Sequence, residues 1–343
     1  MYRTAEGQEI FVVDGHMHFW DASPENWRNE YGEGWIRCFY DYHTSLSPAE
    51  YVWPFEKYCR YDEETLLSDL FHEGFVDVGI FNSTYLHEFY HRGFNTHEQN
   101  NVLKTKFPER FILCGSFDPR AEQAGLDDLR QMVDAFPIEG IKLYTAEWRN
   151  GSRGWSLTDR WSYRHLETCQ ELGIRNIHVH KGPTIYPLDS DAFDVRDVDR
   201  AATDFPELNF IVEHCGLPRL DDFCWIAQQE SNVYAGLAVA IAFIDSRPRY
   251  FAEIIANLVY WLGDERILFG SDYALWSPKW LIENFIEFEL PEDIRDEYGV
   301  ELTLETKRKV LGENAARLYG IDIPARRQRL AEDPIGLQLA AAD

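Results

Sequence analysis

The chain has 343 residues, of which 45% are hydrophobic, which is enough to form one large buried core. Acidic residues outnumber basic ones by 59 to 33, so the formal net charge is −26. A field of that sign repels nucleic acid and anionic membrane surfaces, and neither is expected as a partner.

Short apolar or β-branched runs recur along the chain, and most are followed by a segment with helical periodicity. The predicted strands are 10–14, 76–82, 111–117, 140–144, 174–180, 209–214, 233–239 and 266–272. Helices are predicted between them, for example at 125–135, 161–172 and 195–204. Eight strands in βα order predict an α/β protein with a closed (β/α)₈ TIM barrel. An open doubly wound sheet fits less well, because no glycine-rich phosphate loop follows the first strand.

Two segments depart from the repeat of a single barrel domain spanning 1–343. Segment 19–65 follows the first strand and is rich in aromatic residues, among them Trp20, Trp27, Tyr31, Trp35, Phe39, Tyr40, Tyr42, Tyr51, Trp53, Phe55 and Tyr58. An insertion in this position lies on the catalytic face of a barrel, so it is predicted to form a lid over the pocket, or else an oligomer interface or satellite core. The C-terminal tail, 324–343, is predicted to be a surface helix or a partner contact.

Histidine pairs occur near the ends of two predicted strands. The first strand runs into VVDGHMHFW, which places His16 and His18 two residues apart. The fifth ends in IHVHKG, which does the same for His178 and His180. Alternate side chains of a strand share one face, so both members of a pair can point toward one ion.

Two further strand ends carry metal-binding side chains, His214 in VEHCG and Asp272 in FGSD. The carboxyl ends of barrel strands converge on one face, where the active site of this architecture lies. Imidazole and carboxylate ligands suit Zn²⁺, Fe²⁺ or Mn²⁺. The alternative interpretation, that these are buried histidines with satisfied hydrogen bonds, explains one or two of them better than it explains the whole set.

The ordered motifs resemble the amidohydrolase superfamily, in particular the branch that includes the aminocarboxymuconate semialdehyde and resorcylate decarboxylases. The resemblance runs from HMH through HVHKG, IVEHCGLP and LFGSDYA to KRKVLGENAARLYGI, nearly the whole chain. It implies that the metal ligands or catalytic groups are His16, His18, His180, His214 and Asp272. It also implies one or two divalent transition metal ions as the cofactor, with Asp272 and His214 in catalytic roles.

Three residues leave alternatives open. Lys142, in GIKLY, stands where dinuclear members of the superfamily carry a carbamylated lysine that bridges two metals, but a lysine there can also be a salt-bridged structural residue. His178 lies one layer deeper than His180 and can be a further metal ligand, a hydrogen-bond partner of a ligand, or packing. Glu213 has the opposite parity to His214, so it is expected to face the outer helices unless the strand end twists.

The reaction predicted from the resemblance is hydrolysis by metal-activated water, with Asp272 as general base, or decarboxylation of a small organic substrate. The segments NIHVHKGPT, VEHCGLPRLDDFCW and YALWSPKW also resemble a subgroup that includes 2-aminoisobutyrate hydroxylase. That subgroup uses a dinuclear Fe or Mn/Fe centre to hydroxylate C–H bonds, so an oxygenase acting on a small amino or carboxylic acid is the alternative. A second alternative is an inactive structural subunit of a hetero-oligomer.

The cellular setting follows from composition. The six cysteines include no pair with the two-residue spacing of a zinc or redox motif, so we expect reduced thiols in a cytoplasmic protein. The first residues, MYRTAEGQEIF, lack the pattern of an export signal, and no apolar run approaches the roughly 18 residues of a membrane span. The expected partners are a small-molecule substrate and a second barrel chain, identical or related, in a homo- or hetero-oligomer.

Overall fold

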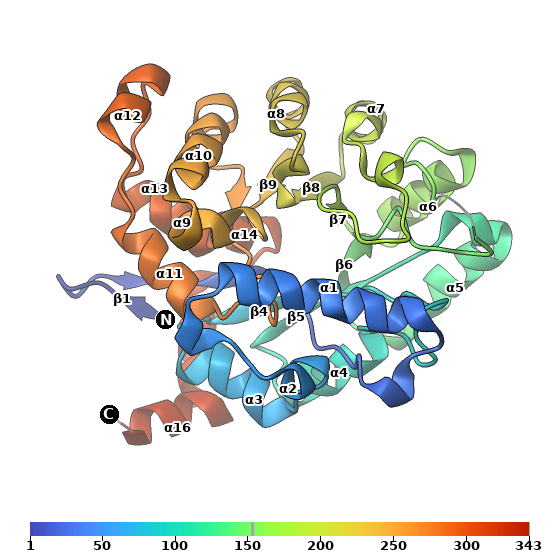
Figure 1. Cartoon of the computed structure of the whole chain (residues 1–343), viewed down its shortest axis with the longest axis horizontal. Coiled ribbons are helices and arrows are strands. Elements are labelled where there is room, and N and C mark those ends of the chain that lie inside the picture. The colour runs from blue at the N-terminus through green and yellow to red at the C-terminus, as the bar shows by residue number, and fades with distance from the viewer. Residues whose placement is uncertain (152–153, 343) are drawn as a thin grey trace.

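The computed structural model describes residues 1–151 and 154–342 and shows a (β/α)₈ barrel (Figure 1). Eight strands form one parallel sheet in which neighbours in the chain are neighbours in space. Hydrogen bonds from Gly15 N to Phe269 O (2.9 Å) and from Asp272 N to His16 O (2.9 Å) join the first and last strand segments. These bonds close the barrel, so the predicted fold class is confirmed.

The barrel strands are short and almost entirely buried, as expected for a parallel sheet covered by helices. They are β3 (Val13–Met17), β4 (Val78–Asn82), β5 (Phe111–Gly115), β6 (Ile138–Leu143), β7 (Asn176–His180), β8 (Asn209–Glu213), β9 (Val233–Gly236) and β10 (Ile267–Leu268). Each falls in or next to a predicted strand. The remaining strands, β1 (Tyr2–Arg3) and β2 (Glu9–Ile10), form a separate antiparallel pair.

Three predicted strands differ most from the observed ones. The first barrel strand begins at Val13, because Ile10 pairs with Tyr2 in the small antiparallel sheet instead of joining the barrel. Strand β9 stops at Gly236, and β10 contains two residues only. The chain beyond β10 leaves regular strand geometry because it must turn over the mouth of the barrel.

Helices surround the strands on the outside (Figure 1). Their bounds are α1 (Glu30–Leu46), α2 (Phe55–Cys59), α3 (Glu63–Leu67), α4 (His97–Lys106), α5 (Glu122–Ala135), α6 (Arg160–Glu171), α7 (Arg196–Asp204), α8 (Leu220–Gln229), α9 (Phe243–Ser246), α10 (Pro248–Leu262), α11 (Pro278–Glu287), α12 (Glu292–Tyr298), α13 (Leu304–Arg308), α14 (Asn314–Leu318), α15 (Ile323–Glu332) and α16 (Pro334–Ala342). Local signals set several of these starts. Thr96 and Gln99 form a capping box on α4, and Asp322 caps α15. The three helices predicted by range correspond to α5, α6 and α7.

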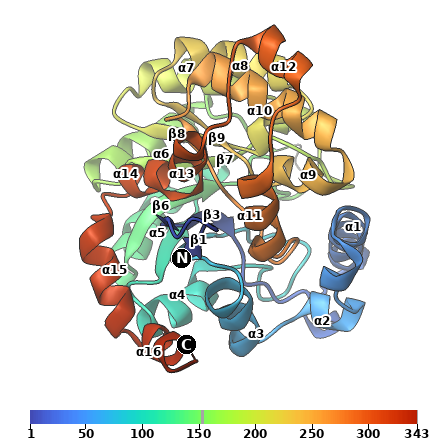
Figure 2. The ribbon, with the colours of Figure 1, turned by 90° about the vertical axis from the view of Figure 1, so that its left-hand side faces the viewer.

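The two unusual segments lie at opposite sides of the strands, as α1 and α15 show in Figure 2. Segment 19–65 contains α1, α2 and the start of α3, and Trp35 and Phe39 of α1 line the pocket over the carboxyl ends of the strands. The tail forms α15 and α16, and Leu330 of α15 packs with Val13, Val78 and other apolar side chains of the barrel. The aromatic segment therefore covers one end of the barrel, and the C-terminal segment covers the other.

All six cysteines are free, as predicted. None of the helices in the described part of the chain is both long enough and apolar enough to cross a membrane.

Candidate metal centre

Three predicted ligands converge at the carboxyl end of the barrel. His16 and His18 come from β3 and its end, and Asp272 follows β10. His16 Nε2 lies 3.2 Å from His18 Nε2, which lies 3.1 Å from Asp272 Oδ1, and His16 Nε2 is 3.6 Å from that same oxygen. All three side chains are buried, and their donor atoms lie within 4.8 Å of one another. Two nitrogens and one carboxylate oxygen in this arrangement suit a divalent transition metal.

The backbone turns sharply at the two predicted ligands that follow strands β8 and β10. His214 has φ of 62° and Asp272 has φ of 57°, in the left-handed region that side chains other than glycine rarely adopt. Such conformations cost free energy and persist only where surrounding contacts enforce them. Here they aim both side chains into the mouth of the barrel.

His180 and His214 form a hydrogen-bonded pair beside the three ligands. His180 Nδ1 lies 2.9 Å from His214 Nε2, and the outer nitrogens lie 3.0 Å from two carbonyl oxygens, those of Pro183 and Ala238. Two neutral imidazoles carry two ring protons and can satisfy only two of these three contacts. Burial lowers the pKa of both rings, that of His180 strongly, so the pair is neutral at pH 7 and has one contact without a proton.

Lys142 lies in the same pocket, and its Nζ is buried with no hydrogen-bond partner among the described residues. Burial lowers its pKa, while the negative charges of Glu213 and Asp272 act in the opposite direction. A buried amine without a hydrogen-bond partner costs free energy, and a ligand or a modification in this pocket can supply that partner.

The pKa values of the ligands favour metal binding. Burial lowers the pKa of His16 to about 3, against the opposing charge of Glu213. Burial raises the pKa of Asp272, but the neighbouring His16, His18 and His214 outweigh it, and the pKa falls below its ordinary value. The His16 ring is therefore neutral and Asp272 ionised near neutral pH, which are the forms that bind metals.

Glu213 does not face the helices, so that expectation was wrong. Its carboxylate is buried inside the barrel, where Oε2 lies 2.8 Å from His16 Nδ1 and Oε1 lies 2.6 Å from His178 Nδ1. The alternation of a regular strand ends at Glu213, and the positive φ of His214 turns the next side chain to the same side. Consecutive residues can therefore both point inward.

His178 has both ring nitrogens occupied by protein groups. Nδ1 contacts Glu213, and Nε2 lies 2.6 Å from the hydroxyl of Tyr319. Of the three roles open to it from sequence, these contacts favour a hydrogen-bond partner beneath the ligands.

Asp272 also lines an apolar cavity of about 330 Å³. His180, His214 and Asp272 lie at one end, and the walls come from the barrel mouth and from α1: Phe39, Tyr42, Leu46, Tyr144, Ile185, Val239, Phe243, Leu275 and Trp276. No lysine or arginine among the described residues belongs to this lining. The cavity has the size of a small organic molecule, and most of its lining is apolar.

Comparison with protein-family profiles shows the family to which this barrel belongs. The amidohydrolase family profile matches residues 13–321, from the first barrel strand to the end of the eighth βα unit. The chain belongs to the amidohydrolase family. Its membership confirms the predicted superfamily, whereas the resemblance to the oxygenase subgroup stays a prediction. No curated protein matches the sequence significantly.

Solved structures with this amidohydrolase fold span nearly the whole chain. An uncharacterised TIM-barrel protein from Bordetella bronchiseptica is 17% identical with a TM-score of 0.68, covering 91% of this chain and 99% of its own. A zinc-bound amidohydrolase from Burkholderia multivorans is 16% identical with a TM-score of 0.59, over 90% and 99% of the two chains. The 2,6-dihydroxybenzoate decarboxylase from Rhizobium is 14% identical with a TM-score of 0.60, over 92% and 100%. At these identities the likeness concerns the fold alone.

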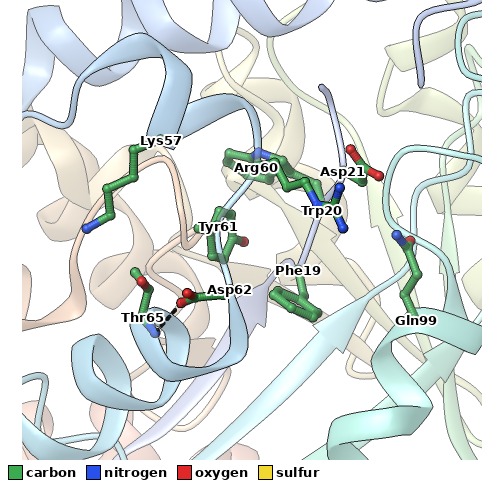
Figure 3. Close-up of a pocket in the computed structure, with 9 residues that line it drawn as sticks. All are labelled: Phe19, Trp20, Asp21, Lys57, Arg60, Tyr61, Asp62, Thr65 and Gln99. Atoms are coloured by element: carbon green, nitrogen blue, oxygen red, sulfur yellow. Dashed lines mark hydrogen bonds between the residues drawn. The ribbon is translucent and has the colours of Figure 1, made fainter. Parts of the chain in front are cut away.

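A second, larger groove of about 470 Å³ lies beside the candidate metal centre (Figure 3). It is lined by Phe19, Trp20, Asp21, Lys57, Arg60, Tyr61, Asp62, Thr65 and Gln99. Its acidic side chains are engaged locally: Asp62 accepts from Thr65 N at 2.9 Å and Asp21 pairs with Arg92. Tyr61 links the groove to the metal ligands by donating to the backbone oxygen of His18 at 2.8 Å. The groove supports the wall of the site and brings no predicted metal ligand of its own.

Three residues around the ligands were not predicted from the sequence. Glu213 was expected on the wrong face of its strand. The side-chain amide of Asn95 contacts His18 Nδ1 at 2.8 Å, and Tyr319 reaches His178 from beyond α14. The acidic residue directly before a strand-end histidine in VEHCG was a usable signal for Glu213. Asn95 and Tyr319 come from loops far away in sequence and carry no such local signal.

Proposed function

We propose that this chain is a metal-dependent enzyme that hydrolyses or decarboxylates a small organic molecule. The observation that carries the proposal is the buried group of His16, His18 and Asp272, the last of which also lines an apolar cavity. Membership of the amidohydrolase family supports it, and so does the fold shared with a zinc-bound amidohydrolase and a decarboxylase. The lack of a cationic group among the described residues of the cavity wall favours a substrate whose one polar group meets the ligands.

The residues that would hold the metal are His16, His18 and Asp272, with His180, His214 and Lys142 lining the same pocket. Zn, Fe or Mn fits this donor set, and a carbamylated Lys142, which lines the same pocket, would be a candidate ligand for a second ion. A divalent metal supplies a Lewis acid that polarises a carbonyl or carboxylate oxygen.

The chain's own groups handle the protons and the solvent. Asp272 is an ionised carboxylate at the edge of the cavity and can accept a proton. The His180–His214 pair has one proton too few for its contacts, so it can take up a proton at His214 Nε2 and return it. Phe39, Phe243 and Trp276 form apolar walls that limit the access of water.

Activity assays on metal-loaded protein test this proposal. The substrates are a panel of small aryl and alkyl carboxylic acids, assayed for CO₂, together with their esters, amides and lactones, assayed for acid release. We expect turnover that chelation abolishes and added metal restores. Full activity after chelation, with no metal in the purified protein, contradicts the proposal. Bound iron with turnover that requires O₂ overturns hydrolysis in favour of the oxygenase alternative.

Three further expectations remain proposals. Segment 19–65 acts as a lid, since α1 supplies Trp35 and Phe39 to the pocket wall. The protein works in the cytoplasm, and it assembles with a second barrel chain. Sedimentation of the purified protein tests the assembly, because a monomer at micromolar concentration contradicts it.

A further inference from the structure

A line of polar side chains runs through the apolar interior of the barrel, from its floor to the first metal ligand. Tyr319, at the end of α14, contacts His178 Nε2 through its hydroxyl at 2.6 Å. His178 Nδ1 contacts Glu213 Oε1 at 2.6 Å. Glu213 Oε2 lies 2.8 Å from His16 Nδ1, which is an ion-pair distance, but the angles of this contact are not those of a hydrogen bond.

The protons along this line can be assigned by counting. Each oxygen of the buried Glu213 carboxylate faces a ring Nδ1, that of His16 or that of His178, and an ionised carboxylate can only accept hydrogen bonds. Both histidines must then carry their protons on Nδ1. His178 Nε2 is left as an acceptor for the hydroxyl of Tyr319, and His16 Nε2 is left with a lone pair. That lone pair lies on the side of His18 and Asp272.

The backbone is shaped to hold the carboxylate in this position. A Cβ on Gly236 would collide with Glu213 Oε2, so only glycine in the neighbouring strand leaves room for it. Glu213, His178 and His16 are each at most 2% exposed. Burying such a network is expensive, and apolar side chains of similar volume commonly stabilise a core as well or better. Core packing alone does not explain why this network is buried, whereas its contact with the metal ligand His16 does.

We propose that Glu213, His178 and Tyr319 are positioning residues that fix the tautomer and orientation of His16 and strengthen Nε2 as a metal ligand. Carboxylates that accept the second N–H of a ligating histidine have this effect in metal sites generally. The inference rests on the proposed function, because a tuned ligand matters only if the site holds a metal. It adds that Tyr319, directly after α14, contributes to metal affinity from the far end of the barrel.

Metal affinity measured by chelator competition, with Zn²⁺ as the probe, tests the inference. Glu213→Gln keeps the size of the side chain and removes its charge, and we expect it to weaken Zn²⁺ binding by about 10- to 100-fold. Tyr319→Phe removes one hydroxyl, and we expect it to weaken binding by about two- to tenfold, the size of one buried hydrogen bond.

Tyr90→Phe is the matched control. Tyr90 is fully buried, its ring packs on Phe94, and its hydroxyl donates one hydrogen bond to Gly32 O at 2.7 Å and not to a metal ligand or its partners. We expect it to lower the melting temperature about as much as Tyr319→Phe while leaving Zn²⁺ affinity unchanged.

The outcomes separate the two proposals. If the wild-type protein binds no Zn²⁺, Mn²⁺ or Fe²⁺, the proposed function fails. If the wild type binds metal and Tyr319→Phe binds it as tightly as Tyr90→Phe does, the positioning inference is overturned while the proposed function stands. Should Glu213→Gln fail to fold, Tyr319→Phe decides the matter alone, because its conservative change keeps the barrel packed.

Discussion

Gly182 offers a sharp test of the role of His214. A Cβ added to Gly182 lies 2.7 Å from His214 Cδ2 and 2.8 Å from its Cβ. Non-bonded carbon atoms prefer about 3.5–4.0 Å, so Gly182→Ala must displace the ring or the loop by roughly 1 Å. The ring is held by contacts to His180 Nδ1 at 2.9 Å and Ala238 O at 3.0 Å, and both are lost or stretched by such a shift.

Two magnitudes follow for this variant. Overpacking a buried site costs about 1–3 kcal/mol of unfolding free energy. A misplacement of about 1 Å in a catalytic group can lower the rate roughly 100-fold. We therefore expect Gly182→Ala to remain folded, to lose modest stability in urea, and to lose kcat far more than KM on the best substrate of the panel.

Gly34→Ala is the control for this experiment. Gly34 lies in α1, where an added methyl group would have nothing within 4 Å, and its backbone is helical. Alanine there should stabilise the helix by about 0.5–1 kcal/mol without changing turnover. If Gly182→Ala unfolds like the wild type and turns over at the wild-type rate, His214 is not the proton-transfer group that we propose.

Three other predictions concern the ligands and their surroundings. Asp272→Asn should retain the circular dichroism spectrum of the wild type and lose about 10²- to 10⁴-fold in turnover, because the amide cannot accept a proton. Chelation should lower the unfolding free energy by about 2.7 kcal/mol if metal was present at 100 times its Kd, as urea titration would show. Burial raises the pKa of Asp14 from 3.8 to about 7. The protonated Asp14 side chain therefore contributes fully to stability below pH 3.8, and this contribution is lost as the pH rises through about 7. The wild type should lose unfolding free energy relative to Asp14→Asn across that range. A difference in unfolding free energy that does not change with pH contradicts this prediction.

The barrel and its ligand-bearing ends were predictable because both follow from local periodicity. The two-residue spacing of His16 and His18 fixes their common face once the strand exists, and the order of the strands fixes where they meet. Strand bounds were less predictable, since the pairing of Ile10 with Tyr2 depends on which chain segment lies nearby.

The parts that escaped prediction depend on backbone conformation and long-range contact. Glu213 and His214 both point inward because the positive φ of His214 turns its side chain to the face that Glu213 already occupies. A positive φ at a residue other than glycine cannot be recognised from the residue type. Tyr319 lies 141 residues from His178 in the chain. The two side chains meet only because the end of α14 packs beneath the barrel. Local patterns thus identified the ligands, while the residues that orient them required the fold.

Anomalous scattering from crystals of metal-loaded protein tests the central claim most directly. We predict a metal peak enclosed by His16, His18 and Asp272, with a second peak beside Lys142 if the centre is dinuclear. The energy of the absorption edge identifies the element as zinc, iron or manganese. Fully loaded crystals with no anomalous peak among these three side chains contradict the account.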